Sequence, residues 1–290
     1  MSVQALPGDG SAARAGFGQR VAAALGRHGH LCVGLDPSAA TLAAWGLPDT
    51  ADSLARFSDR MIEASAGRCG FIKPQAAFYE RLGPAGLAVL GQVLVTAHQA
   101  GLISLVDVKR GDIGSTVDGY AAAYLADAAP WQADAITLSP YLGFGSLRGA
   151  IDLALAGGRG VFVLALTSNP DGATVQGALR PDGLTVGQDI LAQAGQVNAL
   201  SPGLGSVGVV VGATLGALPP VTSQLLNQLG GPILAPGLGA QGASPADLKA
   251  LFGDSYAQVI APASRALAKL GPDLTTLRDG VASLQELLAI

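Results

Sequence analysis

Short apolar segments alternate eight times with amphipathic segments along this chain. The apolar segments are continuous rather than alternating with polar residues, which is typical of parallel strands covered on both faces. Each closes on glycine, proline or polar residues, and they span residues 30–37, 70–75, 103–109, 135–140, 161–169, 207–214, 232–237 and 258–264. The pattern predicts helices over residues 52–66, 84–100, 115–128, 146–156, 188–200, 219–229, 245–252 and 273–290.

Eight strand–helix units in one chain predict an α/β fold of the (β/α)8 TIM-barrel type. A doubly wound open sheet is the alternative, but eight regular units favour closure. We expect a single catalytic domain over residues 19–290, preceded by a flexible N-terminal arm over residues 1–18. Two longer stretches, 39–50 and 170–186, follow strand ends where barrels place binding loops, and the second is a candidate lid.

Composition argues against several classes of partner. Of the 290 residues, 49% are hydrophobic and 13% are charged, and the formal net charge is −4. Without a long basic run, binding to nucleic acid or to an anionic membrane is a poor hypothesis. No apolar run is long enough to span a membrane, and the N-terminus lacks the apolar region of a signal peptide. Cys32 and Cys69 lie in apolar segments, as small buried side chains do in a reducing compartment, so we expect a cytoplasmic protein.

The third apolar segment carries a dense group of charges at its end. Asp107 and Lys109 are two residues apart, so on a strand they project from the same face. Gly111 then breaks the strand, and Asp112 begins the next element. Buried charges must pair or take part in chemistry. On this pattern alone, an ion pair between Asp107 and Lys109 with Asp112 as a helix cap stays open.

Other predicted strands also end in polar residues, and in a barrel these ends meet at one rim. The first ends at Asp36, the second at Lys73 and Gln75, the fifth at Ser168 and its neighbours, and the eighth at Arg265. Any one of these could be a satisfied structural group. Two lysines, three aspartates and an arginine at one rim are hard to explain by stability alone.

The last two loops have the features of a phosphate site. Glycines in residues 237–242 free backbone N–H groups to approach an anion, and Arg265 adds a fork of donors before a possible short helix. An ordinary glycine-rich turn with a surface arginine is the structural alternative. The same glycines match G-x-G-x-x-G, but the next strand does not end in the acidic residue that a dinucleotide site requires. NAD binding is therefore a weak hypothesis.

The charged run resembles the signature of one enzyme family. Asp107-Val-Lys109-Arg-Gly-Asp112-Ile-Gly-Ser-Thr116 is similar to the Asp-x-Lys-x-x-Asp-Ile pattern, with a threonine nearby, of orotidine 5′-phosphate decarboxylases. The resemblance covers most of the chain, and further landmarks follow in the family's order at residues 32–37, 71–75, 140–143, 236–242 and 264–265. The run Lys-Pro-Gln-Ala-Ala-Phe-Tyr-Glu from residue 73 is similar to the longer bacterial subgroup.

This resemblance implies a (β/α)8 homodimer that converts orotidine 5′-monophosphate to UMP and carbon dioxide. The reaction is the last step of de novo pyrimidine nucleotide synthesis, and it needs no metal and no cofactor. By resemblance, Lys109 is the general acid that protonates the pyrimidine carbon, and Asp107 lies beside the departing carboxylate. Asp36 and Lys73 are implied to hold ribose hydroxyls and to order the Asp-Lys-Asp charge network.

The resemblance also implies contacts to the rest of the substrate and to a second subunit. Ser168 would contact the base, while Gln241 and Arg265 would bind the phosphate. Asp112 and Thr116 would reach across the dimer interface into the partner's site.

The physical argument agrees with a role for lysine, although two other functions stay open. Decarboxylation leaves negative charge on a ring carbon without a good electron sink, so a fixed ammonium is the most useful group. A metal-dependent decarboxylase or aldolase acting on a phosphorylated sugar acid would share the Asp-x-Lys strand. A non-catalytic phosphosugar-binding barrel would use the charges structurally. A Lys109→Ala variant distinguishes this binding barrel from an enzyme. If the lysine is structural, the main effect is a lower Tm, whereas a catalytic lysine predicts lost turnover with the fold intact.

Overall fold

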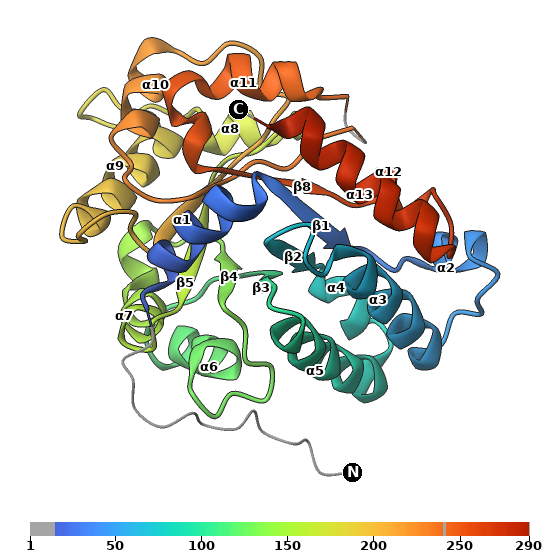
Figure 1. Cartoon of the computed structure of the whole chain (residues 1–290). Coiled ribbons are helices and arrows are strands. Elements are labelled where there is room, and N and C mark those ends of the chain that lie inside the picture. The colour runs from blue at the N-terminus through green and yellow to red at the C-terminus, as the bar shows by residue number, and fades with distance from the viewer. Residues whose placement is uncertain (1–14, 240–241, 290) are drawn as a thin grey trace.

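A computed structural model describes residues 15–239 and 242–289 and contains a closed barrel of parallel strands (Figure 1). β1 pairs with β2 on one side and with β8 on the other, so the sheet closes and an open doubly wound sheet is excluded. The strands are β1 (Leu31–Leu35), β2 (Phe71–Pro74), β3 (Ile103–Arg110), β4 (Ala135–Leu138), β5 (Gly160–Leu166), β6 (Val207–Val211), β7 (Ile233–Leu234) and β8 (Val259–Ala263).

Helices surround the strands (Figure 1). They are α1 (Phe17–His28), α2 (Ala39–Ala44), α3 (Ala51–Ser65), α4 (Ala76–Glu80), α5 (Gly83–Gln99), α6 (Gly114–Leu125), α7 (Arg148–Ala156), α8 (Gly172–Gln176), α9 (Val186–Asn198), α10 (Pro220–Asn227), α11 (Pro245–Phe252), α12 (Arg265–Ala268) and α13 (Leu274–Leu288), with short 3-10 helices η1 (Phe144–Leu147) and η2 (Gly253–Gln258). Side-chain caps fix several helix starts: Thr185 and Ser244 each form a capping box.

The predicted alternation of strands and helices is confirmed. The differences are shifted ends of elements and four additional helices, α1, α2, α4 and α8, that were not predicted. The fifth predicted strand runs to residue 169, whereas β5 ends at Leu166, because the polar residues that follow line a cavity rather than pair with a neighbouring strand. Helices α2 and α8 lie in the stretches 39–50 and 170–186. Their six and five residues are too few to show an apolar period in the sequence.

The core has two layers, as expected for a filled barrel. The outer layer lies between strands and helices, and the inner layer fills the barrel with residues such as Phe71, Leu105, Phe162 and Ile260. Of the helices in residues 15–239 and 242–289, none is long and apolar enough to cross a membrane.

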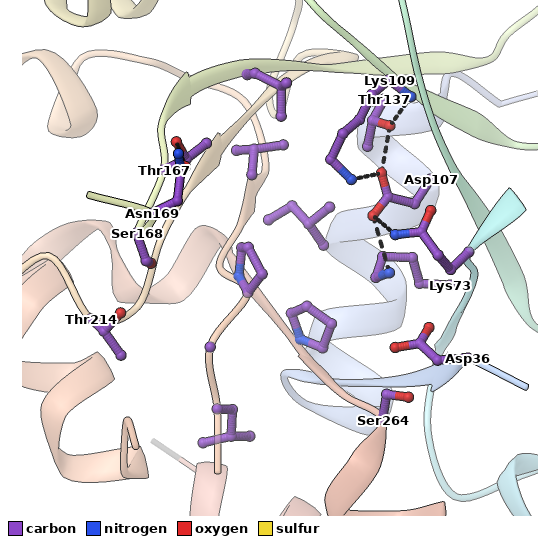
Figure 2. A pocket seen from close by; sticks show the side chains of 18 of the residues that line it. Asp36, Lys73, Asp107, Lys109, Thr137, Thr167, Ser168, Asn169, Thr214 and Ser264 are labelled. Carbon is purple, nitrogen blue, oxygen red and sulfur yellow. Dashed lines mark hydrogen bonds and ion pairs between the residues drawn. The ribbon is translucent and has the colours of Figure 1, made fainter. Parts of the chain in front are cut away.

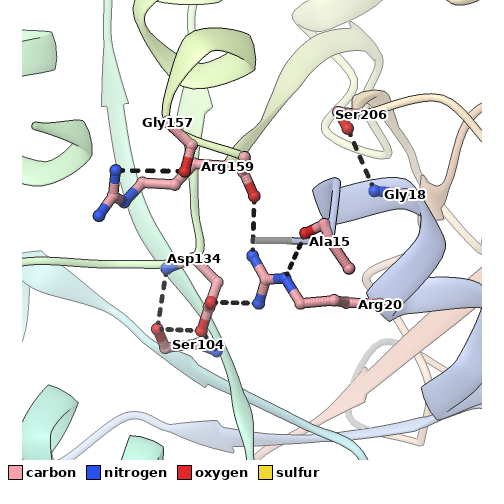
Figure 3. A network of polar contacts seen from close by, with 9 residues as sticks. Ala15, Gly18, Arg20, Ser104, Asp134, Gly157, Arg159 and Ser206 are labelled. Atoms are coloured by element: carbon pink, nitrogen blue, oxygen red, sulfur yellow. Dashed lines mark hydrogen bonds and ion pairs between the residues drawn. The ribbon is translucent and has the colours of Figure 1, made fainter. Parts of the chain in front are cut away.

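Helix α1 covers the N-terminal end of the barrel. Phe17 is fully buried against the inner layer, with its ring 5.9 Å from that of Phe162 in an edge-on arrangement. Arg20 anchors the helix: Nη1 lies 2.5 Å from Asp134 Oδ1, just before β4, and Nη2 donates to the carbonyl of Gly158 (Figure 3). Of the arm expected over residues 1–18, residues 1–14 lie outside the described residues, and Phe17 and Gly18 belong to α1.

Candidate active site

A cavity of about 590 Å³ opens at the C-terminal ends of the strands (Figure 2). Leu164, Val210 and Leu234 line it and also contact the inner core layer, so the cavity rests on the packed interior of the barrel. Its polar lining consists of Asp36, Lys73, Gln75, Asp107, Lys109, Thr137, Thr167, Ser168, Asn169, Thr214, Ser264 and Arg265.

The carboxylate of Asp107 is the most highly coordinated group in this cavity (Figure 2). Oδ1 lies 2.6 Å from Lys109 Nζ and accepts a hydrogen bond of 2.8 Å from Thr137 Oγ1. Oδ2 lies 3.3 Å from Lys73 Nζ and accepts a hydrogen bond of 3.1 Å from Gln75 Nε2. Two cations and two neutral donors from β2, β3, β4 and the residue after β2 therefore fix this carboxylate.

Electrostatics keep Asp107 and Lys73 ionised despite their burial. Burial opposes ionisation of Asp107, but the ammonium groups of Lys73 and Lys109 outweigh it and lower the pKa of Asp107 to about 2. Burial likewise opposes the charge on Lys73, but the carboxylates of Asp107 and Asp36 outweigh it and raise the pKa of Lys73. At neutral pH the pair is charged.

The two lysines differ in their access to the cavity. The side chain of Lys73 is 9% exposed, whereas that of Lys109 is 48% exposed. Lys73 is thus held within the wall, and Lys109 presents its ammonium to a molecule in the cavity.

Three buried oxygens along the cavity have no hydrogen-bond partner within the described part of the chain: Asp36 Oδ1, Ser168 Oγ and Ser264 Oγ. Asp36 follows β1, Ser168 follows β5 and Ser264 follows β8. Buried polar atoms are nearly always satisfied, so these three are available to hydrogen-bond a polar ligand.

The loop after β7 and the start of α12 form one end of the cavity. Gly237 and Gly239 have φ angles of 129° and 68°, a region that favours glycine and leaves the backbone open to a ligand. Arg265 lines the cavity beside this loop and begins α12, as the expected short helix requires. The chemistry of this end suits an anion.

The side chain of Gln176 joins the candidate lid, residues 170–186, to Thr167, which follows β5. Gln176 in α8 accepts a hydrogen bond of 2.8 Å from the backbone N–H of Thr167 and donates one of 2.7 Å to Thr167 Oγ1. The segment therefore lies next to the cavity-lining residues that follow β5.

Six of the nine site residues predicted from the sequence line the cavity: Asp36, Lys73, Asp107, Lys109, Ser168 and Arg265. Gln241 lies outside the described residues. Asp112 and Thr116 are not part of the cavity lining formed by the described residues. Asp112 is half-buried and accepts a hydrogen bond from the N–H of Ile113, and Thr116 is exposed at the start of α6.

Large apolar side chains are exposed on the segments that follow β3 and β4, and the first of these segments also carries Asp112 and Thr116. Ile113 is 62% exposed, Leu142 is 53% exposed and Tyr141 is 79% exposed. Since large exposed apolar side chains are rare in clusters, these three residues, called the rim patch below, mark a candidate interface.

The polar contacts of Gln75 and Thr137 to Asp107 were not predicted from the sequence. Gln75 lies at the end of a predicted strand, but its position in the sequence does not predict a hydrogen bond to Asp107. Thr137 carries a hydroxyl group within the predicted apolar segment 135–140, and a polar residue in such a segment is the only available signal.

Comparisons with known proteins point to one family. The model of the orotidine 5′-phosphate decarboxylase / HUMPS family matches residues 29–278. The orotidine 5′-phosphate decarboxylase of Streptomyces coelicolor is 51% identical over 262 residues, which is 90% of this chain and 93% of that protein. The enzyme of the same name from Salinispora arenicola is 50% identical over the same coverage.

Solved structures agree with these sequences. The crystal structure of a Streptomyces avermitilis protein, provisionally given the same enzyme name, covers 99% of this chain and 97% of its own, at 45% identity and a TM-score of 0.89. The Leishmania donovani OMP decarboxylase structure covers 94% of this chain and 99% of its own, at 28% identity and a TM-score of 0.72.

Proposed function

The chain belongs to the orotidine 5′-phosphate decarboxylase / HUMPS family, and from this premise we propose that it converts orotidine 5′-monophosphate to UMP and carbon dioxide. This reaction is the last step of de novo pyrimidine nucleotide synthesis. One observation carries the proposal: the Asp107 carboxylate lies between two ammonium groups in the cavity, and one of them, that of Lys109, is exposed to it. The buried cation of Lys73, the anion of Asp107 and the exposed ammonium of Lys109, which can donate a proton, are thus held side by side.

In the proposed reaction, the bond between a pyrimidine ring carbon and its carboxylate breaks, and carbon dioxide leaves. The electron pair stays on the ring carbon, where a fixed ammonium stabilises the developing negative charge without reorganisation. Lys109 Nζ then transfers a proton to that carbon, which forms the C–H bond of UMP. The neutral amine regains its proton from water. Lys109 is the candidate because its ammonium is the exposed one.

We place Asp107 beside the substrate carboxylate. Its pKa of about 2 keeps it ionised at neutral pH, so a second carboxylate next to it would be repelled. That repulsion ends when carbon dioxide leaves. The four donors to Asp107 support this role because they prevent the carboxylate from turning away.

The remaining contacts follow the cavity from Asp107 to Arg265. Asp36 and Lys73 would hold the ribose hydroxyls, and the unpartnered Oδ1 of Asp36 supports this. Ser168, with its unpartnered Oγ, would contact the base. Arg265 and Gln241 would bind the phosphate at the glycine-rich end. Phosphate binding far from the reacting carbon supplies energy for orienting the base.

We further propose that the reaction needs neither a metal nor an organic cofactor. Lys109 supplies both the positive charge and the proton that the chemistry requires. A cytoplasmic location is part of the same proposal, since Cys32 and Cys69 are free and buried, which suits a reducing compartment.

A homodimer with shared sites is the proposed functional unit. The rim patch lies on the segments after β3 and β4, next to the cavity, and burying it against a second copy would remove its apolar surface from water. Asp112 and Thr116, which are not part of the lining that the described residues form in their own chain, would then enter the partner's cavity.

Mixing two inactive variants tests the shared site. If Asp112 acts in the partner's cavity, a hybrid of Lys109→Ala and Asp112→Ala subunits contains one intact site. Equal mixing should therefore recover about a quarter of the wild-type activity, because half of the dimers are hybrids and each has one of two sites intact. Activity that stays at the level of the separate variants contradicts sharing.

The reaction itself is tested by following the ultraviolet absorbance of orotidine 5′-monophosphate with purified protein in buffer containing EDTA. Conversion to UMP supports both the reaction and its independence of a divalent metal. If turnover appears only with a divalent ion and a phosphorylated sugar acid, the substrate proposal is wrong and the barrel serves a metal-dependent reaction.

A further inference from the structure

We propose that Thr137 is a positioning residue that holds Lys109 and Asp107 in their reactive arrangement through a single hydroxyl group. The inference rests on the proposed decarboxylation and adds a residue that the motif does not contain. It is carried by the backbone of β3, by two hydrogen bonds and by the burial of the threonine.

The first observation is an irregularity in the pairing of β3 with β4. Leu105 and Val106 pair with Ala135 and Ile136, but the next paired residues are Arg110 and Leu138. Three residues of β3, numbers 107–109, therefore lie opposite Thr137 alone. Such a bulge leaves backbone groups without their usual partner in the sheet.

The second observation is the backbone of Lys109 within this bulge. Its φ angle is 45°, and among the described residues it is the one residue other than glycine with a positive φ. A residue with a side chain adopts this conformation at an energetic cost and keeps it only where the surroundings enforce it. Something must therefore hold Lys109 there.

The hydroxyl of Thr137 meets that requirement. The backbone N–H of Lys109 donates to Thr137 Oγ1 at 2.9 Å, and the same oxygen donates its hydrogen to Asp107 Oδ1 at 2.8 Å. A hydroxyl can accept and donate at the same time. Thr137 is 2% exposed, so water cannot easily replace it when it is removed.

The consequence for the site follows from the oxygen that Thr137 contacts. Asp107 Oδ1 accepts from Thr137 and also lies 2.6 Å from Lys109 Nζ (Figure 2). One hydroxyl thus fixes the start of the Lys109 side chain, through its backbone, and the end of it, through the carboxylate. Lys73 and Gln75 hold only the other oxygen, Oδ2.

The test compares Thr137→Val, which keeps the shape but removes both hydrogen bonds, with Thr137→Ser, which keeps the hydroxyl. Misplacing a reacting group by about 1 Å costs about 10²-fold in rate, so we expect Thr137→Val to lower kcat by about that factor. The KM for orotidine 5′-monophosphate and the affinity for UMP should change by less than about threefold, because neither bond is proposed to contact the substrate. Thr137→Ser should retain most of kcat.

Thr222→Val is the matched control for the loss of a buried threonine hydroxyl. Thr222 in α10 is also 2% exposed and accepts a hydrogen bond of 3.1 Å from Gln188, but it does not line the cavity. The Thr222→Val variant should lower Tm, as Thr137→Val does, but should leave kcat unchanged. Crystal structures of the Thr137 variants add a readout independent of activity: in Thr137→Val the φ of Lys109 should move away from 45°.

Three results would overturn the inference. They are a wild-type kcat in Thr137→Val, a loss in Thr137→Ser as large as in Thr137→Val, or an unchanged Lys109 backbone in the valine variant. Wild-type protein without activity on orotidine 5′-monophosphate is a different result, because it rejects the proposed function first and this inference with it.

Discussion

Lys73 and Asp107 form an ion pair in which the ammonium lies 3.3 Å from Oδ2 and both side chains are buried. Burial disfavours the charged form of both side chains. The carboxylate of Asp107 offsets this for Lys73, and the ammonium of Lys73 offsets it for Asp107. Removing either partner leaves a buried charge with less compensation, so the pair links the stability of the barrel to the chemistry of its site.

The stability that Asp107 contributes should disappear in acid. Its pKa falls from an ordinary value of 3.8 to about 2 on folding. The unfolded chain therefore takes up the proton first, and the contribution is complete above about pH 4 and lost as the pH falls to about 2. A shift of this size corresponds to about 2 kcal/mol. In urea titrations at several pH values, wild type should lose stability over this window more steeply than Asp107→Asn. If the free energy of unfolding of wild type and of Asp107→Asn changed with pH in parallel, Asp107 would not contribute stability through its lowered pKa.

Replacing Lys109 by alanine should abolish turnover and leave the fold intact. The change removes the group proposed to act both as proton donor and as cation, and each such role contributes about 10²-fold or more to the rate. We expect a loss of at least about 10⁴-fold in kcat, measured by the absorbance assay, with an unchanged circular dichroism spectrum. Lys269→Ala, at an exposed lysine just after α12, is the control and should behave as wild type. A variant that is active but melts much earlier would make Lys109 a structural residue.

Truncating Phe17 should affect stability and spare catalysis. Phe17→Ala leaves a cavity at the N-terminal end of the barrel, opposite the active site, and such truncations cost about 3–5 kcal/mol. Denaturant unfolding should show this loss, while kcat and KM, measured where the variant is folded, stay within about twofold of wild type. A large drop in kcat of the folded variant would mean that α1 influences the site across the barrel.

Arg265→Ala should weaken the binding of UMP far more than that of uridine. The guanidinium is proposed to contact the phosphate alone, and a charge-assisted contact of this kind contributes about 1.5–3 kcal/mol. Calorimetric titration of both ligands into wild type and variant gives the comparison. Equal losses for the two ligands would place Arg265 away from the phosphate.

A charge in the rim patch should separate the proposed dimer into monomers. Leu142→Asp would bury a carboxylate in the interface, whereas Leu200→Asp, at a residue that is 89% exposed outside the patch, should not. Sedimentation velocity measures the oligomeric state. Activity should fall with the fraction of dimer, because each site is proposed to need Asp112 of the partner subunit. A fully active monomer rules out the shared site.

Much of the fold could be predicted because parallel strands and their covering helices leave a strong pattern. Eight continuous apolar segments predicted the strands, and their polar ends predicted which residues share the cavity: Asp36, Lys73, Asp107, Lys109, Ser168 and Arg265 all line it. Their individual chemical roles stay predictions.

The rest depends on geometry that no local pattern contains. The bulge in β3 sets both the positive φ of Lys109 and its contact with Thr137, and neither follows from the residues themselves. The attachment of α8 through Gln176 is similar, since it joins residues across a segment with no apolar period.

Among the described residues, α1 covers the N-terminal end of the barrel with Phe17 and Arg20, and the cavity opens at the opposite end, where the strands finish. Nucleotide must arrive, and both products must depart, between the same loops at the carboxyl ends of the strands. Any loop movement that shelters the reaction from water therefore also delays product escape, so the speed of reopening sets an upper limit on turnover.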